Sequence, residues 1–260
     1  MDVYKEIEFN NINRIKEYLD WIQSDYSETK DIIRITQIGS DIKYYKGSPL
    51  HYAVSEDKSE ILKLLINHPV LKDIININIK NSNGESPLNV GCSLGSLESV
   101  KLLLQHPDID INSKDKSLAT PLYCCVYFYL HDDPSQNHYK IAKLLLQQSD
   151  IDVNIKDIEG YTPLYLAILL SRNKMIELLL THPDTDVNAK HKEYKSCLEE
   201  AIYNNNMEAI KMLINHPRIN LTSISYNKYR LLKNLEVRLY VKANLLQKSP
   251  MKKILNSIQE

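Results

Sequence analysis

The sequence predicts an all-α fold, a solenoid of stacked helix-turn-helix units with short turn or hairpin tips. The first observation is a start marker, Ser-Pro-Leu or Thr-Pro-Leu, whose proline stands at positions 49, 87, 121 and 163, with Ser196-Cys197-Leu198 in the same place once more. The second is a His-Pro pair that follows the marker by 20 residues in four of the five copies. The third is helical spacing of the apolar residues between the two markers. Together they indicate one repeated unit.

The clearest copy of the unit runs from residue 160 to residue 193. Thr162 can accept the free amide hydrogens of a helix start, and Pro163 suits the first helical position, where its missing donor costs nothing. A break at 171–173 leads to a second, leucine-rich helix, which we expect His182-Pro183 to end because proline lacks an amide hydrogen. Neither helix can bury its apolar side alone, so copies must stack beside it.

The opening Thr-Pro-Leu-Tyr-Leu-Ala, the segment Ile-Glu-Leu-Leu-Leu and the exit Asp-Val-Asn-Ala-Lys together resemble the ankyrin repeat. The resemblance covers residues 43–221 in five copies and implies paired antiparallel helices. In two respects the chain departs from the family pattern. His-Pro replaces the glycine after the second helix, and the family histidine after Pro-Leu is kept only as His51. In the other four copies its place is taken by Asn89, Tyr123, Tyr165 and Glu199.

We expect one elongated domain over residues 1–260. Residues 1–42 lack the start marker but have apolar residues at helical spacing, which predicts N-terminal capping helices; these residues are Ile12, Ile15, Leu19 and Ile22. Residues 222–260 are also helical by pattern and should form a C-terminal cap over the last repeat. Repeat three carries an insertion around 130–138, whose Asp-Asp-Pro-Ser content predicts a loop.

Composition excludes several classes of function. The chain has 32 Lys and Arg against 33 Asp and Glu, a formal net charge of −1, which favours neither a nucleic acid nor an anionic membrane as partner. The longest apolar run, 122–130, is too short to span a membrane. The four cysteines fall at first-helix positions, which favours buried thiols in a reducing compartment. We therefore expect a cytoplasmic protein, placed in the host cytosol if it is a secreted effector.

The histidines do not form a metal site by their spacing. Four of them hold equivalent positions in successive units: His68, His106, His182 and His216. Packed helices lie about 8–10 Å apart, whereas zinc needs ligands within about 2.3 Å, so these side chains line up without converging. No catalytic or phosphate-binding motif is present. The sequence thus predicts no metal, no cofactor and no enzyme.

The resemblance implies that a protein partner binds the concave face, built from turn tips and exposed first-helix positions. The residues carried over to this face are Tyr44, Tyr45, Glu56, Glu85, Leu94, Tyr127, Phe128, Ile158, Glu159, Tyr161, Leu169, Lys192 and Tyr203. Tyrosine is frequent at binding hot spots, and an exposed apolar stripe is typical of a partner site. A second interpretation stays open, in which Tyr127, Phe128, Leu169 and Leu170 pack between neighbouring first helices or under the insertion.

Two further sets of residues permit two interpretations each. The basic set is either the solvated face of a capping helix or a second site for an acidic partner, and consists of Lys228, Arg230, Lys233, Arg238 and Lys242. The asparagine set either resembles the pattern accepted by asparaginyl hydroxylases in ankyrin proteins or hydrogen-bonds its local turns, and consists of Asn112, Asn154 and Asn188.

The sequence therefore predicts a monomeric protein-binding module, a scaffold, regulatory or host-modulating factor without catalysis of its own. One alternative is an adaptor that uses the basic set as its second site. Another is an enzyme or small-ligand binder that uses the polar residues of the insertion: His131, Asp132, Asp133 and His138.

Overall fold

The computed structural model divides into two compact units, Met1–Asp152 and Val153–Glu260. The residues that it describes are 3–24, 47–69, 71, 75–130, 134–192, 195–221 and 235–248. The all-α prediction is confirmed, since the strands among these residues are the two-residue β1 (Lys190–His191) and β2 (Lys195–Ser196), which pair antiparallel. Within the described residues, no helix combines the length and the hydropathy needed to cross a membrane.

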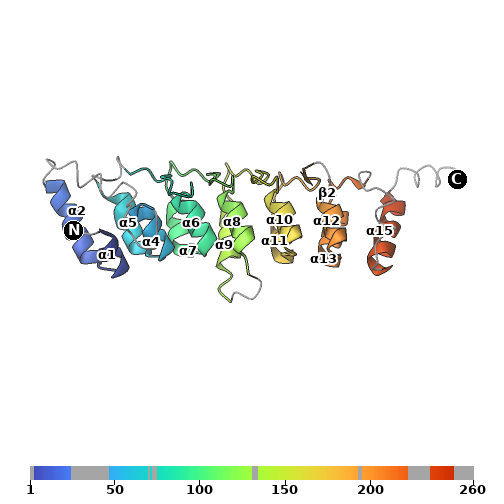
Figure 1. Ribbon diagram of the computed structural model, residues 1–260, viewed down its shortest axis with the longest axis horizontal. Coiled ribbons are helices and arrows are strands. Elements are labelled where there is room, and N and C mark those ends of the chain that lie inside the picture. The colour runs from blue at the N-terminus through green and yellow to red at the C-terminus, as the bar shows by residue number, and fades with distance from the viewer. Residues whose placement is uncertain are drawn as a thin grey trace. The chain divides into compact units, whose positions relative to one another are not determined.

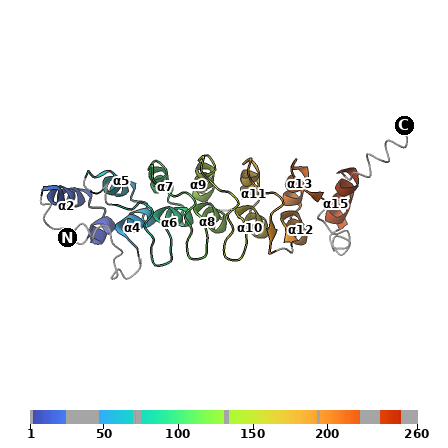
Figure 2. The same ribbon diagram turned by 90° about the horizontal axis from the view of Figure 1, so that it is seen from above.

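The first unit consists of helix pairs (Figure 1). Its helices are α1 (Val3–Glu8), α2 (Ile12–Ser24), α4 (Pro49–Ser55), α5 (Ser59–Asn67), α6 (Pro87–Leu94), α7 (Leu97–Leu103), α8 (Pro121–Phe128) and α9 (Asn137–Leu145). The first helices α4, α6 and α8 pack side by side, and the second helices α5, α7 and α9 form a parallel row (Figure 2). At the N-terminus, α1 packs on α4 and α2 on α5, as expected of capping helices.

The second unit repeats this arrangement. Its helices are α10 (Pro163–Leu169), α11 (Asn173–Leu180), α12 (Cys197–Tyr203), α13 (Met207–Asn215) and α15 (Leu235–Lys248). First helix α10 packs on α12, and second helix α11 packs on α13. In α15, Val237 and Val241 are fully buried, and the Tyr240 ring lies 5.9 Å from the Lys211 ammonium of α13. Residues 235–248 of the predicted C-terminal cap are thus helical, and the rest of it, 222–234 and 249–260, lies outside the described residues.

The start marker works as predicted. Each first helix begins after a Ser or Thr with extended backbone, and in four of the five helices that residue is followed by proline. The Thr162 hydroxyl accepts the amide of Tyr165 at 3.2 Å, and the Ser86 hydroxyl accepts that of Asn89 at 3.2 Å. These bonds satisfy donors that a helix start leaves without a partner.

The residue after Pro-Leu ties one repeat to the next. His51 Nδ1 accepts the Ser48 amide at 3.1 Å, so Nε2 carries the proton and donates to the Glu85 carbonyl at 3.0 Å. Asn89 reproduces both roles in repeat two: Oδ1 accepts the Ser86 amide, and Nδ2 donates to the carbonyls of Ser113 and Ala119. In repeat five, Glu199 keeps the first role, accepting the Ser196 amide at 2.9 Å.

The predicted helix ends need a correction in two of the four copies. α5 and α13 end directly before His68 and His216, as predicted. α7 ends at Leu103 and α11 at Leu180, before His106 and His182 are reached. Each of these imidazoles instead accepts the amide two residues on through Nδ1, that of Asp108 at 3.2 Å and that of Asp184 at 3.3 Å. His106 and His182 therefore bond within the turn that follows the helix and do not end the helix itself.

The predicted loop of repeat three is shorter than expected. Asn137 and His138, assigned to the loop, are the first residues of α9. Asn137 Nδ2 donates to the Gly95 carbonyl at 3.0 Å, and His138 Nε2 bonds the Ser93 carbonyl at 3.0 Å. These contacts hold α9 to the preceding repeat, so the helix begins at Asn137, inside the predicted loop. His131, Asp132 and Asp133 lie outside the described residues.

Candidate functional site

Exposed apolar side chains lie on one side of each unit. Among the described residues, the exposed large hydrophobic side chains are Phe9, Leu94, Leu118, Tyr127, Phe128, Leu130, Ile158, Tyr203 and Leu239. All except Phe9 and Leu239 belong to a first helix, to the residues that end it or to a hairpin tip. None belongs to the second helices α5, α7, α9, α11 or α13. We call the exposed surface of the first helices and tips of a unit its first-helix face.

In the first unit this face carries an aromatic cluster at the end of α8. The Tyr127 and Phe128 rings meet edge to face at 5.0 Å, and Tyr127 stacks with Tyr123 at 6.5 Å. Tyr127, Phe128 and Leu94 at the end of α6 are each about half exposed. The alternative that Tyr127 and Phe128 are packed away from solvent is therefore wrong.

The other predicted residues of this unit are polar or lie outside the described residues. Glu56 caps the end of α4 and is exposed. Glu85 is half-buried, and its carboxylate accepts the side-chain amides of Asn81 at 2.8 Å and Asn83 at 3.3 Å. Tyr44 and Tyr45 belong to the part of the chain that the structure does not describe.

In the second unit three rings stack on one another. The Tyr161 ring lies 4.3 Å from His191 and 5.4 Å from Tyr165, while Tyr165 and His191 are 5.7 Å apart. Tyr161 is half-buried by this stack and Tyr165 is fully buried. The stack links the tip before α10 to the tip before α12. Tyr161 therefore stabilises the face as well as contributing to its surface.

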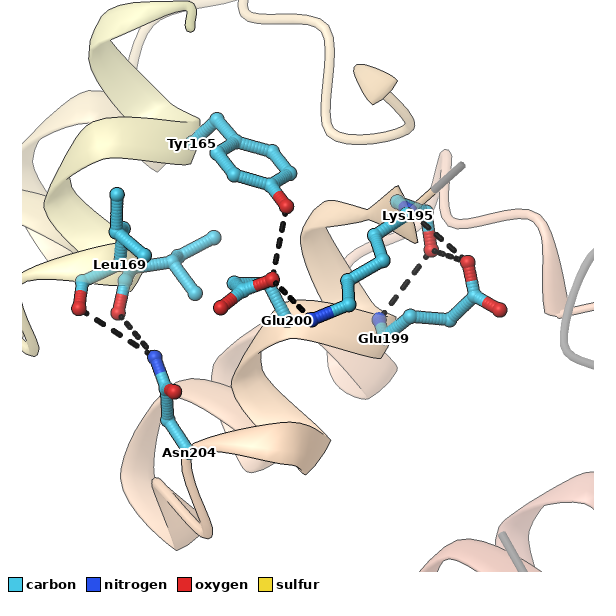
Figure 3. A network of polar contacts seen from close by, with 8 residues as sticks. Tyr165, Leu169, Lys195, Glu199, Glu200 and Asn204 are labelled. Atoms are coloured by element: carbon cyan, nitrogen blue, oxygen red, sulfur yellow. Dashed lines mark hydrogen bonds and ion pairs between the residues drawn. The ribbon is translucent and has the colours of Figure 1, made fainter. Parts of the chain in front are cut away.

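A polar network lies beside this stack (Figure 3). The Tyr165 hydroxyl donates to Glu200 Oε2 at 2.8 Å, and the Lys195 ammonium lies 3.3 Å from the same oxygen. Burial, followed by the hydrogen bond to Glu200, raises the pKa of Tyr165, so its phenol stays protonated as the donor. The Lys195 ammonium also lies 3.8 Å from the centre of the Tyr203 ring, which is 69% exposed.

The helix α12 is also bonded to α10 at its far end. Asn204 Nδ2 donates to the carbonyls of Ile168 and Leu169 at 3.4 Å (Figure 3). Leu169 is half-buried there, and Ile158 in the tip before α10 is exposed. The predicted residues of the second unit therefore lie along one packed pair of first helices.

The charges of this face in the second unit are largely paired within the face. The Lys192 ammonium lies 2.9 Å from Glu159 Oε2, and this hydrogen bond lowers the pKa of Glu159 and raises the pKa of Lys192. Both side chains are exposed, so salt screens the pair. Lys195 is paired with Glu200. What remains free for a partner is mainly the apolar and aromatic surface.

The predicted asparagines form bonds between repeats. Each side-chain amide donates to one carbonyl of the turn that follows the second helix of the next repeat, and accepts one amide there. The bonds of Asn112 run to Asp150 and Asp152, those of Asn154 to Asp184 and Asp186, and those of Asn188 to Arg218 and Asn220. Asn78, which the sequence analysis missed, bonds Asp108 and Asp110 in the same way. The expected local turn bond is thus made to the next turn instead, and hydroxylation stays a prediction.

Replacing Asn154 by alanine is expected to lower the free energy of unfolding by about 1 kcal/mol, because two hydrogen bonds are lost but water reaches the groups left behind. The Asn154→Asp variant should cost more, since its second carboxylate oxygen would face the Asp184 carbonyl at the 2.8 Å of the present bond. Urea denaturation of the three proteins measures the difference. An Asn154→Asp variant as stable as the parent would contradict this role.

The remaining predicted sites are described only in part. Arg238 is half-buried on α15, the side chain of Lys242 on the same helix is not described, and Lys228, Arg230 and Lys233 lie outside the described residues. The second basic site therefore stays a prediction.

The cysteines are free thiols, and all four are buried. Burial raises the pKa of Cys124 to about 12 and also raises the pKa of Cys92 and Cys197, so these thiols are protonated and unreactive at neutral pH. Among the described residues, no three His, Cys, Asp or Glu side chains come together as metal ligands.

Comparison with protein families gives one repeated match. The model for ankyrin repeats in sets of three copies matches residues 22–115, 67–157 and 130–225. The solved ankyrin repeat domain of Bcl-3, a member of the IκB protein family, has the same fold with a TM-score of 0.70. The alignment covers 85% of this chain and 88% of that domain at 18% sequence identity. The likeness confirms the predicted solenoid.

Individual relatives match over shorter stretches. A putative ankyrin repeat protein of Rickettsia bellii is 32% identical over 122 residues, which are 45% of this chain and 17% of that protein. Human Rabankyrin-5 is 31% identical over 81 residues, 31% of this chain and 6% of that protein. Chicken NF-kappa-B inhibitor alpha is 39% identical over 59 residues, 23% of this chain and 17% of that protein. The matches thus span less than a fifth of each relative.

Proposed function

The chain belongs to the ankyrin repeat family, and from this premise we propose that it binds a protein partner through its first-helix face, without catalysis of its own. Ankyrin repeat domains are protein-interaction modules. For this chain the proposal is supported by the segregation of exposed hydrophobic side chains: the first helices and tips carry them, and the described second helices do not.

The chemistry of the face favours a protein partner over a small ligand. In the second unit Tyr203 presents a largely exposed ring, and in the first unit Tyr127 and Phe128 present two more. Rings of this kind bury much area at small entropic cost, which suits them as hot spots of a protein interface. The neighbouring Lys195 and Lys192 are already paired with Glu200 and Glu159, so the second unit does not depend on net charge for binding.

The proposal includes a cytoplasmic location and a monomeric chain, with a scaffold, regulatory or host-modulating role. The buried free thiols, which suit a reducing compartment, support the cytoplasmic location. The partner is to be identified by affinity capture with the whole chain.

The test of the face uses two exposed rings. Alanine at Tyr203 and at Tyr127 should weaken capture of the partner at least tenfold for each ring, because a hot-spot side chain contributes about 2 kcal/mol or more. The melting temperature should change by no more than about 2 °C, since both rings are about half exposed or more. Glu177→Ala on the exposed side of α11 is the matched control and should leave capture unchanged.

Two results would remove the first-helix face from consideration: undiminished capture by both tyrosine variants, or a loss of capture by Glu177→Ala equal to theirs. Tyr203 is a better test position than Tyr161, whose ring is stacked on His191 and whose loss would also disturb the fold.

A further inference from the structure

Three hairpin tips share one turn. In each, the amide of the first residue donates to the carbonyl of the fifth, and the amide of the fourth donates to the carbonyl of the first. These turns run from Asn81 to Glu85, from Asp115 to Ala119 and from Asp157 to Tyr161. The side-chain oxygen of the first residue also accepts the amide of the fifth, at 3.0, 2.8 and 2.8 Å. The three tips therefore share one backbone structure, so a difference in residue type at the same position is not required by the turn.

The fourth residue of this turn has a left-handed backbone. Two of the tips place glycine there, Gly84 with φ 76° and Gly160 with φ 92°, whereas the third places Leu118 with φ 60°. A residue with a Cβ is strained at such angles, and leucine lacks the short polar side chain that lets Asn or Asp tolerate them. The Leu118 side chain is also 43% exposed, so burial offsets this strain only in part. The fold alone favours glycine at this position.

Two lysines precede this leucine in the same tip. Lys114 and Lys116 are exposed, and neither ammonium has an ion-pair or hydrogen-bond partner among the described residues. The nearby carboxylate of Asp115 accepts the amides of Ser117 and Ala119 and is thus turned toward its own tip. The tip thus combines one exposed apolar side chain with two exposed lysines that are unpaired among the described residues.

We propose that the tip 114–118 is a dedicated contact for an acidic protein segment that carries a large aliphatic side chain. Leu118 meets the aliphatic group, and Lys114 and Lys116 meet carboxylates of the same segment. This inference rests on the proposed protein-binding function and specifies the chemistry of the partner at one tip. The strain at Leu118 is retained because the side chain is used in binding.

Two variants at position 118 separate strain from contact. Leu118→Gly removes the apolar side chain and also the backbone strain. Because the strain is relieved, this variant should raise the melting temperature of the whole chain by about 2–4 °C. Leu118→Ala removes the aliphatic group but keeps the Cβ, so its melting temperature should stay near that of the parent. A fall in melting temperature for Leu118→Gly would show that the leucine is needed by the fold, and would overturn the proposal.

The binding test selects peptides from a random 12-residue phage-displayed library on the whole chain. Enriched peptides should have an excess of Asp and Glu and at least one large aliphatic residue. Their affinity should fall at least tenfold for Leu118→Ala and for the double variant Lys114→Glu, Lys116→Glu, and it should fall with rising salt. Glu177→Ala, on a second helix, is the control and should bind as the parent does.

The proposal is overturned if the enriched peptides bind Leu118→Ala as well as the parent, if they lack an acidic excess, or if nothing is enriched. Peptides that lose affinity for Tyr203→Ala but keep it for Leu118→Ala would leave the first-helix face intact and remove only this tip. Failure of this inference is thereby distinguished from failure of the proposed function.

Discussion

Replacing His51 by alanine is expected to lower the free energy of unfolding by about 3 kcal/mol. The imidazole is fully buried, and its loss leaves a cavity as well as two groups without partners, the Ser48 amide and the Glu85 carbonyl. Because the second of these bonds joins repeat one to the tip of repeat two, the first helix pairs should separate at lower urea concentration. Urea denaturation followed by circular dichroism measures the effect.

The matched control is His51→Asn. Asn89 already performs both roles at the same place in repeat two, so this variant should retain the bonds and cost no more than about 1 kcal/mol. A His51→Asn variant as unstable as His51→Ala would contradict the equivalence of the two positions.

The same pair of variants tests the pH dependence of stability. Burial lowers the pKa of His51, His68 and His216 below the ordinary value of 6.5, with the charge of Arg218 adding to the effect at His216. The unfolded chain then binds protons at a pH where the folded chain does not. Stability is fully present above pH 6.5 and falls as the pH drops toward the folded pKa values. His51→Asn should reduce this fall between pH 7.5 and 5.5, and an unchanged fall would exclude His51 as a contributor.

The repeat and its first helices were predictable because their signals are local. A Ser or Thr before Pro-Leu satisfies a helix start by itself, and the apolar spacing shows which side of each helix is buried. The resemblance to the ankyrin repeat implied the exposed positions of Leu94, Tyr127 and Tyr203, which the structure leaves open to solvent.

The contacts between repeats were not predictable in the same way. The bond from Tyr165 to Glu200 joins residues 35 apart, and it depends on how α10 packs on α12. The asparagine bonds are a related case, since a local turn was expected and the partner lies in the next turn. The early start of α9 likewise depends on Ser93 and Gly95 of the preceding repeat. A periodic pattern identifies the faces that meet, but it does not identify the polar atoms that pair across them.

Replacing Lys195 by methionine is expected to lower the free energy of unfolding by about 2 kcal/mol. Without Lys195, the Glu200 carboxylate would lose its ion pair and keep only the hydrogen bond from the Tyr165 hydroxyl. This is costly because the Glu200 side chain is only 5% exposed. Breaking a fully buried ion pair costs about 3–5 kcal/mol. We expect about 2 kcal/mol here because the Lys195 side chain is 39% exposed and solvent screens its charge. Methionine preserves the apolar contact with the Tyr203 ring, so the change tests the charge.

The double variant Lys195→Met, Glu200→Gln completes the test. A neutral glutamine can still accept the Tyr165 hydroxyl, and it leaves no buried charge without a partner, so most of the lost stability should return. A coupling energy of about 1 kcal/mol or more is expected from the double-mutant cycle measured by urea denaturation. If Lys195→Met costs the same in both backgrounds, the ion pair is not what the substitution disturbs. A recovered stability would instead show that the ion pair with Glu200 fixes the position of Lys195, the cation that lies over the exposed Tyr203 ring.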